Sequence, residues 1–432
     1  MLANKLNSPK LYYGWVIVGV STLILFAAFG IRLSFSVFFV ALIDDFGWSR
    51  ADTSLIFSIT MLVFAATSTM AGIMLDRLGS RVTFTSGAVV LGTGLLLSSQ
   101  IQSLVELALT YGVIAGIGIT VLGLSIHASV VRTWFKQRLG AAIGVAFAGT
   151  GLGAFIVTPS AEALIRNFDW RTAMIFLGLL ILTMIIPIQL FLVDSPEQLG
   201  LQIDGEERGE QQEKRDKSAQ SKTEWSFQNV VRTPAFWLLF LAGVCAIAPV
   251  RMLTVHQFAI MADGGISPEI GARAIGLSGI VAAVTFILGG ALSDKIGRIA
   301  TYALGGVCLI GAFWVTTQFA LGWTVWPYAL LVGIGEGSRS SLVSATTADI
   351  FAGRTLGAIS GTIGAAYGLG AAILPWLAGW LFDEMGSYTL ALWLAAGVTL
   401  ISLGALASAS NAHFRSLSVN DSADFRKSSC KI

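Results

Sequence analysis

Long apolar runs separated by short polar segments dominate the chain, and the first of them contains YYGWVIVGVSTLILFAAFG. About 20 apolar residues cross a bilayer as an α-helix, because each residue adds about 1.5 Å to its length. Runs of suitable length predict twelve membrane-spanning helices, at 14–43, 51–75, 82–100, 105–131, 139–165, 172–193, 234–261, 270–293, 300–320, 326–350, 355–381 and 388–409. This pattern is typical of an all-α polytopic membrane protein.

The segment between the sixth and seventh predicted spans has a different character. It reads DSPEQLGLQIDGEERGEQQEKRDKSAQSKTEW, which is rich in charge and glutamine and poor in large apolar residues. Such a composition is typical of a linker. We therefore expect an N-terminal six-helix bundle at 1–193, a linker at 194–233, a second six-helix bundle at 234–409 and a tail at 410–432.

The composition agrees with a membrane setting. Of 432 residues, 55% are apolar and 12% are charged, whereas soluble domains carry about 25% charged residues. Three cysteines, Cys245, Cys308 and Cys430, form no CxxC pair, and the three histidines lie in no ligand spacing. We therefore expect neither a metal site nor a cofactor. The expected surroundings are the lipid bilayer, with no nucleic acid as a partner.

Lysine and arginine are distributed unevenly between the two sides of the predicted spans. With the amino terminus inside, 20 of the 27 lie in inner segments and 4 in outer loops, and the remaining 3 lie within spans. The excess of positive charge on one side predicts that both termini and the linker face the cytoplasm. We expect a cell membrane, either plasma or bacterial inner membrane, and a protein that functions as a monomer.

The two halves repeat each other in sequence. GIMLDRLGSR at 72–81 aligns with GALSDKIGR at 290–298 after a shift of 218 residues, and LGAAIGVAFAGTGLGA at 139–154 aligns with LGAISGTIGAAYGLGA at 356–371 after a shift of 217. Two separate segments thus agree on nearly the same shift. Duplicated six-span halves are a transporter architecture, which predicts a cargo site at the midplane where the halves meet.

The repeated loops after spans 2 and 8 resemble the signature loop G-x-x-x-D-[RK]-x-G of the major facilitator superfamily. Shorter strings resemble its monocarboxylate-porter and oxalate/formate-antiporter branch, namely YYGW at 12–15, FGWSR at 46–50, WFKQRLGAAIGVAFAGTG at 134–151, SPEQLGL at the linker start and WLAGWLFDEMGSY at 376–388. Oxalate-type members carry a basic residue in span 11 and one in span 8. Here span 11 has none, and span 8 has only Arg273 at its outer edge.

The signature loops supply candidate gating residues, namely Asp76, Arg77, Arg81, Asp294, Lys295 and Arg298. We expect Asp76 to form a small charge network with Arg77 and Arg81 that holds one conformation and breaks in another. The alternative is a solvated turn whose arginines only fix the topology.

Polar residues within the spans are the candidates for cargo binding: Arg32 in span 1, His127 in span 4, Arg251 and His256 in span 7, and Glu336 and Arg339 in span 10. A charged side chain at the bilayer centre costs about 2.5 to 3.5 kcal/mol on insertion scales and therefore needs a partner, a cavity or a cargo. The family resemblance implies that spans 1, 4, 7 and 10 line the central cavity. All six candidates lie on those spans.

The charge balance of these candidates favours an anionic cargo. Three arginines against one glutamate leave positive charge in excess, and the planar fork of a guanidinium can hold both oxygens of a carboxylate. We expect Arg251 to bind the cargo carboxylate, because it has no acidic residue one turn away on its own helix. The repeat shift of 218 residues makes position 32 equivalent to position 250. Arg32 and Arg251 are therefore expected to approach each other from opposite halves at a similar depth.

Each candidate also has a structural alternative. Glu336 and Arg339 are spaced as an i,i+3 ion pair, and Arg32 and Arg251 could brace neighbouring helices. The two histidines lie near span ends, where hydrogen bonding at the interface competes with contact to the cargo.

The expected function is secondary active transport of a small organic anion, foremost a monocarboxylate, by alternating access. A proton taken up by Glu336 would couple transport to protons, whereas simple anion exchange would need no proton site. The rival within transport is an exporter of amphiphilic drugs or metabolites. An enzyme is not expected, because the chain shows no nucleophile, metal-ligand or acid–base cluster, and a nutrient sensor would need a larger signalling segment.

Overall fold

The computed structural model describes residues 12–204, 227–339, 342–351 and 356–429, with side chains described as far as residue 410. Helices make up most of this part of the chain. The β-structure within it is one isolated bridge, between Phe135 and Asp204.

Between residues 12 and 193 the first half contains ten helices and short helical turns. They are α1 (Gly14–Leu33), α2 (Phe35–Phe46), α3 (Arg50–Ser98), α4 (Leu104–Leu107), η2 (Ala108–Ala115), α5 (Gly116–Val121), α6 (Leu124–Trp134), α7 (Leu139–Asn167), α8 (Trp170–Thr183) and α9 (Ile185–Phe191).

After the turn η3 (Pro196–Leu199), the described part of the second half continues with its own helices. They are α11 (Phe227–Val231), α12 (Pro234–Asp263), α13 (Pro268–Ile296), α14 (Arg298–Thr316), η4 (Phe319–Leu321), α15 (Val325–Arg339), α16 (Leu342–Ile350), α17 (Leu356–Met385) and α18 (Thr389–Ser429).

Within the described ranges, ten helices are long and apolar enough to cross a membrane. One of them, α3, has 49 residues and a non-helical break at Gly79, so it contains predicted spans 2 and 3. Predicted span 10 corresponds to α15 and α16, which end and begin on either side of residues 340–341, outside the described ranges. The chain is therefore an all-α polytopic membrane protein, and its helices are consistent with twelve spans.

The sequence repeat reappears in the backbone. Gly79 has φ 78° and ψ 171°, and Gly297, which lies 218 residues later, has φ 91° and ψ 156°. Residues with a side chain rarely adopt a positive φ of this kind, so glycine is needed at both positions. The two signature loops therefore turn in the same way in the two halves.

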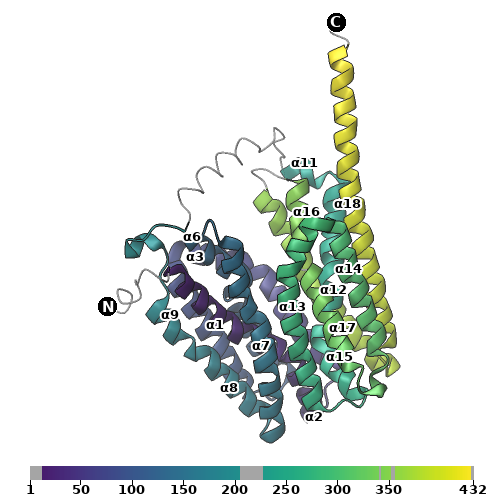
Figure 1. Ribbon diagram of the computed structural model, residues 1–432. Helices are drawn as coiled ribbons and strands as arrows, with labels where there is room; N and C mark the ends of the chain where they lie inside the picture. The colour runs from purple at the N-terminus through teal and green to yellow at the C-terminus, as the bar shows by residue number, and fades with distance from the viewer. Residues whose placement is uncertain (1–11, 205–226, 340–341, 352–355, 430–432) are drawn as a thin grey trace.

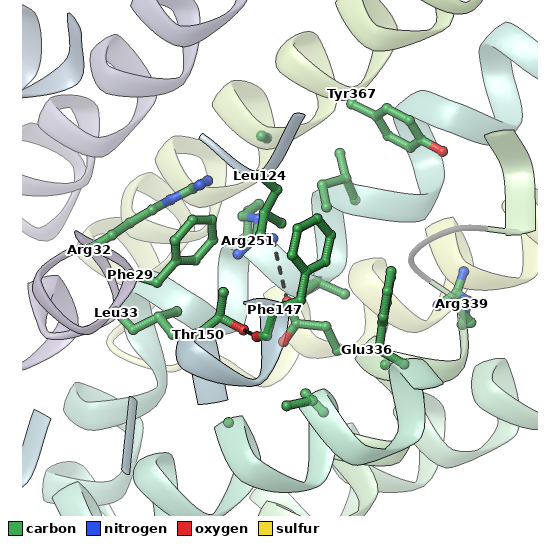
Figure 2. Close-up of a pocket in the computed structure, with 18 of the residues that line it drawn as sticks. Phe29, Arg32, Leu33, Leu124, Phe147, Thr150, Arg251, Glu336, Arg339 and Tyr367 are labelled. Atoms are coloured by element: carbon green, nitrogen blue, oxygen red, sulfur yellow. Dashed lines mark hydrogen bonds and ion pairs between the residues drawn. The ribbon is translucent and has the colours of Figure 1, made fainter. Parts of the chain in front are cut away.

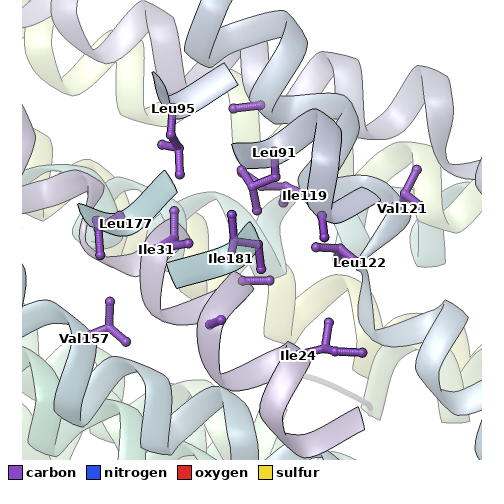
Figure 3. Packing of buried hydrophobic residues seen from close by; sticks show 14 of the residues in the cluster. Ile24, Ile31, Leu91, Leu95, Ile119, Val121, Leu122, Val157, Leu177 and Ile181 are labelled. Atoms are coloured by element: carbon purple, nitrogen blue, oxygen red, sulfur yellow. The ribbon is translucent and has the colours of Figure 1, made fainter. Parts of the chain in front are cut away.

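Figure 3 shows how the first half packs its apolar side chains. Leu91 and Leu95 of α3 lie among Ile119 of α5, Ile31 of α1 and Ile181 of α8, and all five are buried. Lipid is as apolar as these side chains, so close packing, more than removal from water, holds such helices together in a membrane.

The two bundles stand side by side and diverge toward the end where α11 and α16 lie (Figure 1). We call this end the linker face and the opposite end, near α2, the far face. In the described part of the chain, the most extensive contacts between the halves are those of α7 with α13, α3 with α17, and α2 with α12. The structure is therefore closed toward the far face.

Small residues allow the closest helix contacts, and one of them gives a stability prediction. A Cβ atom on Gly153 of α7 would lie 2.2 Å from the carbonyl oxygen of Phe26 in α1. We expect Gly153→Leu to lower the melting temperature of the purified protein by several degrees, because overpacking costs about 1 to 3 kcal/mol. Gly140→Leu is the control, since nothing lies within 4 Å of its Cβ position. Equal melting of the two variants would contradict this packing account.

Candidate functional site

A cavity of about 370 Å³ lies between the two halves. Its walls come from α1, α3, α6 and α7 of the first half and from α12, α13, α15 and α17 of the second. Spans 1, 4, 7 and 10 all contribute, as the resemblance implied. The charged side chains along the described walls are Arg32, Arg251, Arg339 and Glu336 (Figure 2). The structure therefore brings four of the six predicted cargo residues into one chamber.

Arg32 lies in the last turn of α1 and is only 8% exposed. One terminal nitrogen, Nη2, donates to Sδ of Met61 at 3.2 Å, and the guanidinium carbon lies 5.6 Å and 5.8 Å from the ring centres of Phe29 and Phe64. Its Nε atom is buried and has no hydrogen-bond partner. A thioether and two aromatic faces do not neutralise a cation, so the charge of Arg32 is open to an anion.

Arg251 forms an ion pair with Glu336, with Nη2 lying 3.4 Å from Oε1. The second terminal nitrogen, Nη1, lies 3.4 Å from the hydroxyl of Thr254, whereas Nε is buried without a partner. The expectation of an unneutralised charge at Arg251 is therefore wrong. Its counter-charge comes from α15, 85 residues further along the chain, and not from its own helix.

A proline lies close to Arg251 in the sequence. Pro249 is inside α12, two residues before Arg251. Because proline has no backbone N–H, one helical hydrogen bond is missing from the turn that precedes Arg251.

Arg339 lies at the end of α15 and is 4% exposed. Its Nη2 donates to the Tyr302 hydroxyl at 2.8 Å, and its guanidinium lies 4.4 Å from the centre of the same ring. The Tyr302 hydroxyl also contacts Ser402 of α18, whose hydroxyl donates to the Ala242 carbonyl of α12. These contacts make Arg339 part of a polar brace between helices, although Nε and Nη1 are buried without partners.

The two candidate histidines lie outside the cavity lining. His127 is fully buried, stacks on Phe84 at 4.3 Å and has no hydrogen-bond partner on either ring nitrogen. His256 lies within 2.9 Å of the Tyr388 hydroxyl through Nδ1 and within 2.8 Å of the Pro375 carbonyl through Nε2. A carbonyl only accepts, so Nε2 carries a proton. In this conformation His256 joins α12 to α17 and to the turn after it.

The signature loops hold different contacts from those expected. Asp76 and Arg77 are exposed, and no hydrogen bond or ion pair of Asp76 is found in the described part of the chain. Arg81 donates from Nε and Nη2 to the Leu192 carbonyl, at 3.1 Å and 2.6 Å. The expected network of Asp76 with Arg77 and Arg81 is therefore not formed in this conformation. The bundles diverge at the linker face, where these side chains lie.

Asp194 anchors the first loop through a contact that no sequence pattern indicated. It accepts from the backbone N–H and the hydroxyl of Ser80, and a Cβ on Gly79 would lie 2.7 Å from its carboxylate. The sequence places Asp194 at the start of the linker, more than a hundred residues from Ser80, so only the folded chain reveals the contact.

The second loop forms ion pairs of its own. Arg298 contacts Asp349 at 2.7 Å and Asp294 at 3.6 Å, whereas Lys295 is exposed. The gating roles of these residues stay predictions.

Among the residues described, no group of three histidine, cysteine or acidic side chains is placed to hold a metal ion.

Comparisons with known proteins agree with this architecture. A family model described as Major Facilitator Superfamily matches residues 20–338 and 260–417. Monocarboxylate transporter 12 of Rattus norvegicus is 25% identical over 419 residues, which cover 91% of this chain and 85% of that protein. The Xenopus laevis protein of the same name is 28% identical over 411 residues, covering 90% and 86%.

Solved structures are similar in fold. A D-xylose-proton symporter has a TM-score of 0.68 at 16% identity and covers 91% of this chain and 97% of its own. A bacterial homologue of the human lysosomal transporter Spinster, in an inward-facing and occupied conformation, has a TM-score of 0.64 at 15% identity, with 93% and 95% covered. The family model spans nearly the whole chain and the helices are arranged as in these transporters, so the chain belongs to the Major Facilitator Superfamily.

Proposed function

We propose that this protein is a secondary active transporter of a small organic anion, foremost a monocarboxylate, and that it has no enzymatic activity. The observation that carries the proposal is the charge of the cavity, where three guanidinium groups face one carboxylate. That balance leaves two positive charges in excess in a low-dielectric chamber. Such an enclosure attracts an anion and repels a cation.

The geometry divides the arginines into distinct roles. Arg32 has no ion-pair partner among the described residues, whereas Arg251 is paired with Glu336. The cargo carboxylate therefore binds first at Arg32 and then competes with Glu336 for Arg251. Apolar walls from Phe29, Phe64 and neighbouring residues suit the short carbon chain of the cargo, and 370 Å³ is at the small end for ligand pockets.

The relatives named monocarboxylate transporters support this cargo class. Transport would proceed by rocking of the half at 1–193 against the half at 234–409, with the linker at 194–233 connecting them. We place the linker face and both termini in the cytoplasm, in a plasma or inner membrane, with a single chain as the working unit. Asp76 and Asp294 would then control the switch and not the affinity.

Coupling to protons follows from Glu336 in this scheme. A protonated Glu336 would release Arg251 to the anion, so a proton and the cargo would enter together. Simple exchange of one anion for another would leave Glu336 charged throughout. Whether Glu336 takes up a proton during transport therefore distinguishes symport from antiport.

One observation favours a different cargo. The cavity is lined by several aromatic rings, among them Phe147, Phe286 and Tyr367, and such walls also suit amphiphilic drugs or metabolites. An exporter of cationic compounds would nevertheless meet the excess of arginine.

Uptake into proteoliposomes tests the proposed function. We expect labelled lactate, pyruvate, formate or oxalate to accumulate when an acid-outside pH gradient or an internal anion drives the protein, with monocarboxylates preferred. Protein-free vesicles give the background for passive entry of the protonated acids. Uptake of none of these anions, together with transport of a cationic dye, would replace the anion transporter with a drug exporter.

A further inference from the structure

The far face is closed by a contact between the halves that centres on Arg50, the first residue of α3. Its two terminal nitrogens, Nη1 and Nη2, donate to the two carboxylate oxygens of Asp263 at 2.7 Å and 2.8 Å. Asp263 is the last residue of α12 in the second half. This parallel pair of charge-assisted bonds is the strong geometry for a guanidinium and a carboxylate.

A second carboxylate holds the backbone at the same place. Asp383 of α17 accepts from the backbone N–H groups of Arg50 and Ala51, at 3.0 Å and 2.8 Å. The first N–H groups of a helix have no partner within it, so Asp383 of the second half completes a cap of α3 to which the Ser49 hydroxyl of the first half contributes by accepting from the Asp52 N–H. Gly379 permits this approach, because a Cβ there would lie 2.6 Å from the Arg50 carbonyl oxygen.

Aromatic side chains of the second half complete the contact. The guanidinium of Arg50 lies 3.7 Å from the ring centre of Phe382 and 5.2 Å from that of Tyr388. The Tyr388 hydroxyl contacts His256, and Phe39 of α2 packs edge-on against the His256 ring at 5.0 Å. A continuous plug thus runs from Arg50 at the surface to His256 inside.

The plug and the cargo cavity share a helix. Asp263, His256 and Arg251 all lie on α12, and all three follow Pro249 in the sequence. A change at Arg251 can therefore be transmitted along one rigid element to the partner of Arg50.

Ion pairs across the far face all have the same polarity in the described part of the chain. Arg50 and Arg166 come from the first half, and their partners Asp263 and Glu269 come from the second. Arg171 also lies at this face, but it pairs with Asp45 of its own half at 3.0 Å. The first half thus presents cations and the second half presents carboxylates, which attract each other when the face closes.

We propose that Arg50 is the latch of the far face, and that its release from Asp263 and Asp383 is the step that opens the cavity on that side. Arg50 acts by positioning the two halves and touches no cargo. This role holds whichever ion or metabolite the protein carries, so it goes beyond the proposed function.

Reactivity of a buried thiol measures the opening directly. Val37 of α2 is 3% exposed and is buried in a cluster whose other fully buried members belong to the second half. A cysteine there reacts only when the halves separate at this point, so its labelling rate follows the open fraction. The reporter Val37→Cys is placed in full-length protein whose native cysteines have been replaced.

We expect Arg50→Gln and Asp263→Asn each to raise the labelling rate about tenfold, and the double variant to add little more, because both remove the same pair. Arg171→Gln breaks an ion pair that lies at the same face but within one half, so it should leave the rate unchanged. A second reporter, Ala88→Cys in the core of the first half, should stay unreactive in every variant.

The outcomes are decisive in either direction. Faster labelling of Val37→Cys alone supports the latch. An unchanged rate in both Arg50→Gln and Asp263→Asn overturns it, as does an equal rise in Arg171→Gln or in the Ala88→Cys reporter, which would indicate general loosening. The assay uses no cargo, so it can succeed even if the proposed anion is not transported.

Discussion

Arg32→Ala is expected to weaken the binding of a small carboxylate by about tenfold to a hundredfold, the worth of one or two charge-assisted hydrogen bonds. Arg32 is buried at the cavity wall with a sulfur atom and two aromatic rings as neighbours. Its charge is thus ready for the cargo without any ion pair being broken. Arg32→Lys keeps the charge but loses the planar fork, so it should have an intermediate affinity.

Calorimetry on purified, folded variants measures this effect. Arg273→Ala serves as the control, because Arg273 is exposed and lies outside the cavity lining. An affinity for Arg32→Ala within twofold of the unaltered protein would make Arg32 a structural brace and would transfer the carboxylate to Arg251.

Glu336→Gln is expected to have the opposite effect on binding and a severe effect on transport. Removing the counter-charge of Arg251 adds one positive charge to the cavity, so an anion should bind more tightly at neutral pH. Glutamine cannot take up or release a proton. It also carries no negative charge that would compete with the bound anion for Arg251. Net uptake driven by a pH gradient should therefore fall to less than about a tenth.

Two transport assays on the same vesicles separate the mechanisms. Proton-driven uptake should be lost in Glu336→Gln while exchange of internal for external anion continues. Glu106→Gln, which alters an exposed carboxylate away from the cavity, should change neither rate. Undiminished proton-driven uptake in Glu336→Gln would show that Glu336 carries no coupling proton.

The sequence was most informative where a pattern is local. Apolar length identified the spans, and the two segments that repeat in sequence, at 72–81 and 290–298, both have a positive φ, at Gly79 and Gly297. The cost of a charge in a bilayer was sufficient to select Arg32, Arg251, Glu336 and Arg339, because few other positions tolerate one. All four line the cavity.

Pairings between distant helices could not be predicted in the same way. Arg251 and Glu336 are 85 residues apart, and Arg50 and Asp263 are 213 apart. No helical spacing connects such residues, so their contacts depend on how the bundles stand against each other. For the same reason the contact of Arg50 with Asp263 could not be predicted, and the network expected around Asp76 is absent because Asp76 is exposed.

Comparison of pyruvate with its uncharged amide tests most directly the claim that the cavity selects its cargo by negative charge. The two molecules have nearly the same size and shape, so they differ at the cavity mainly in what Arg32 and Arg251 can bind. Calorimetry on the unaltered protein should show saturable binding of pyruvate, with the amide weaker by about a hundredfold or more. Equal binding of the two, or binding of the amide alone, would contradict the account.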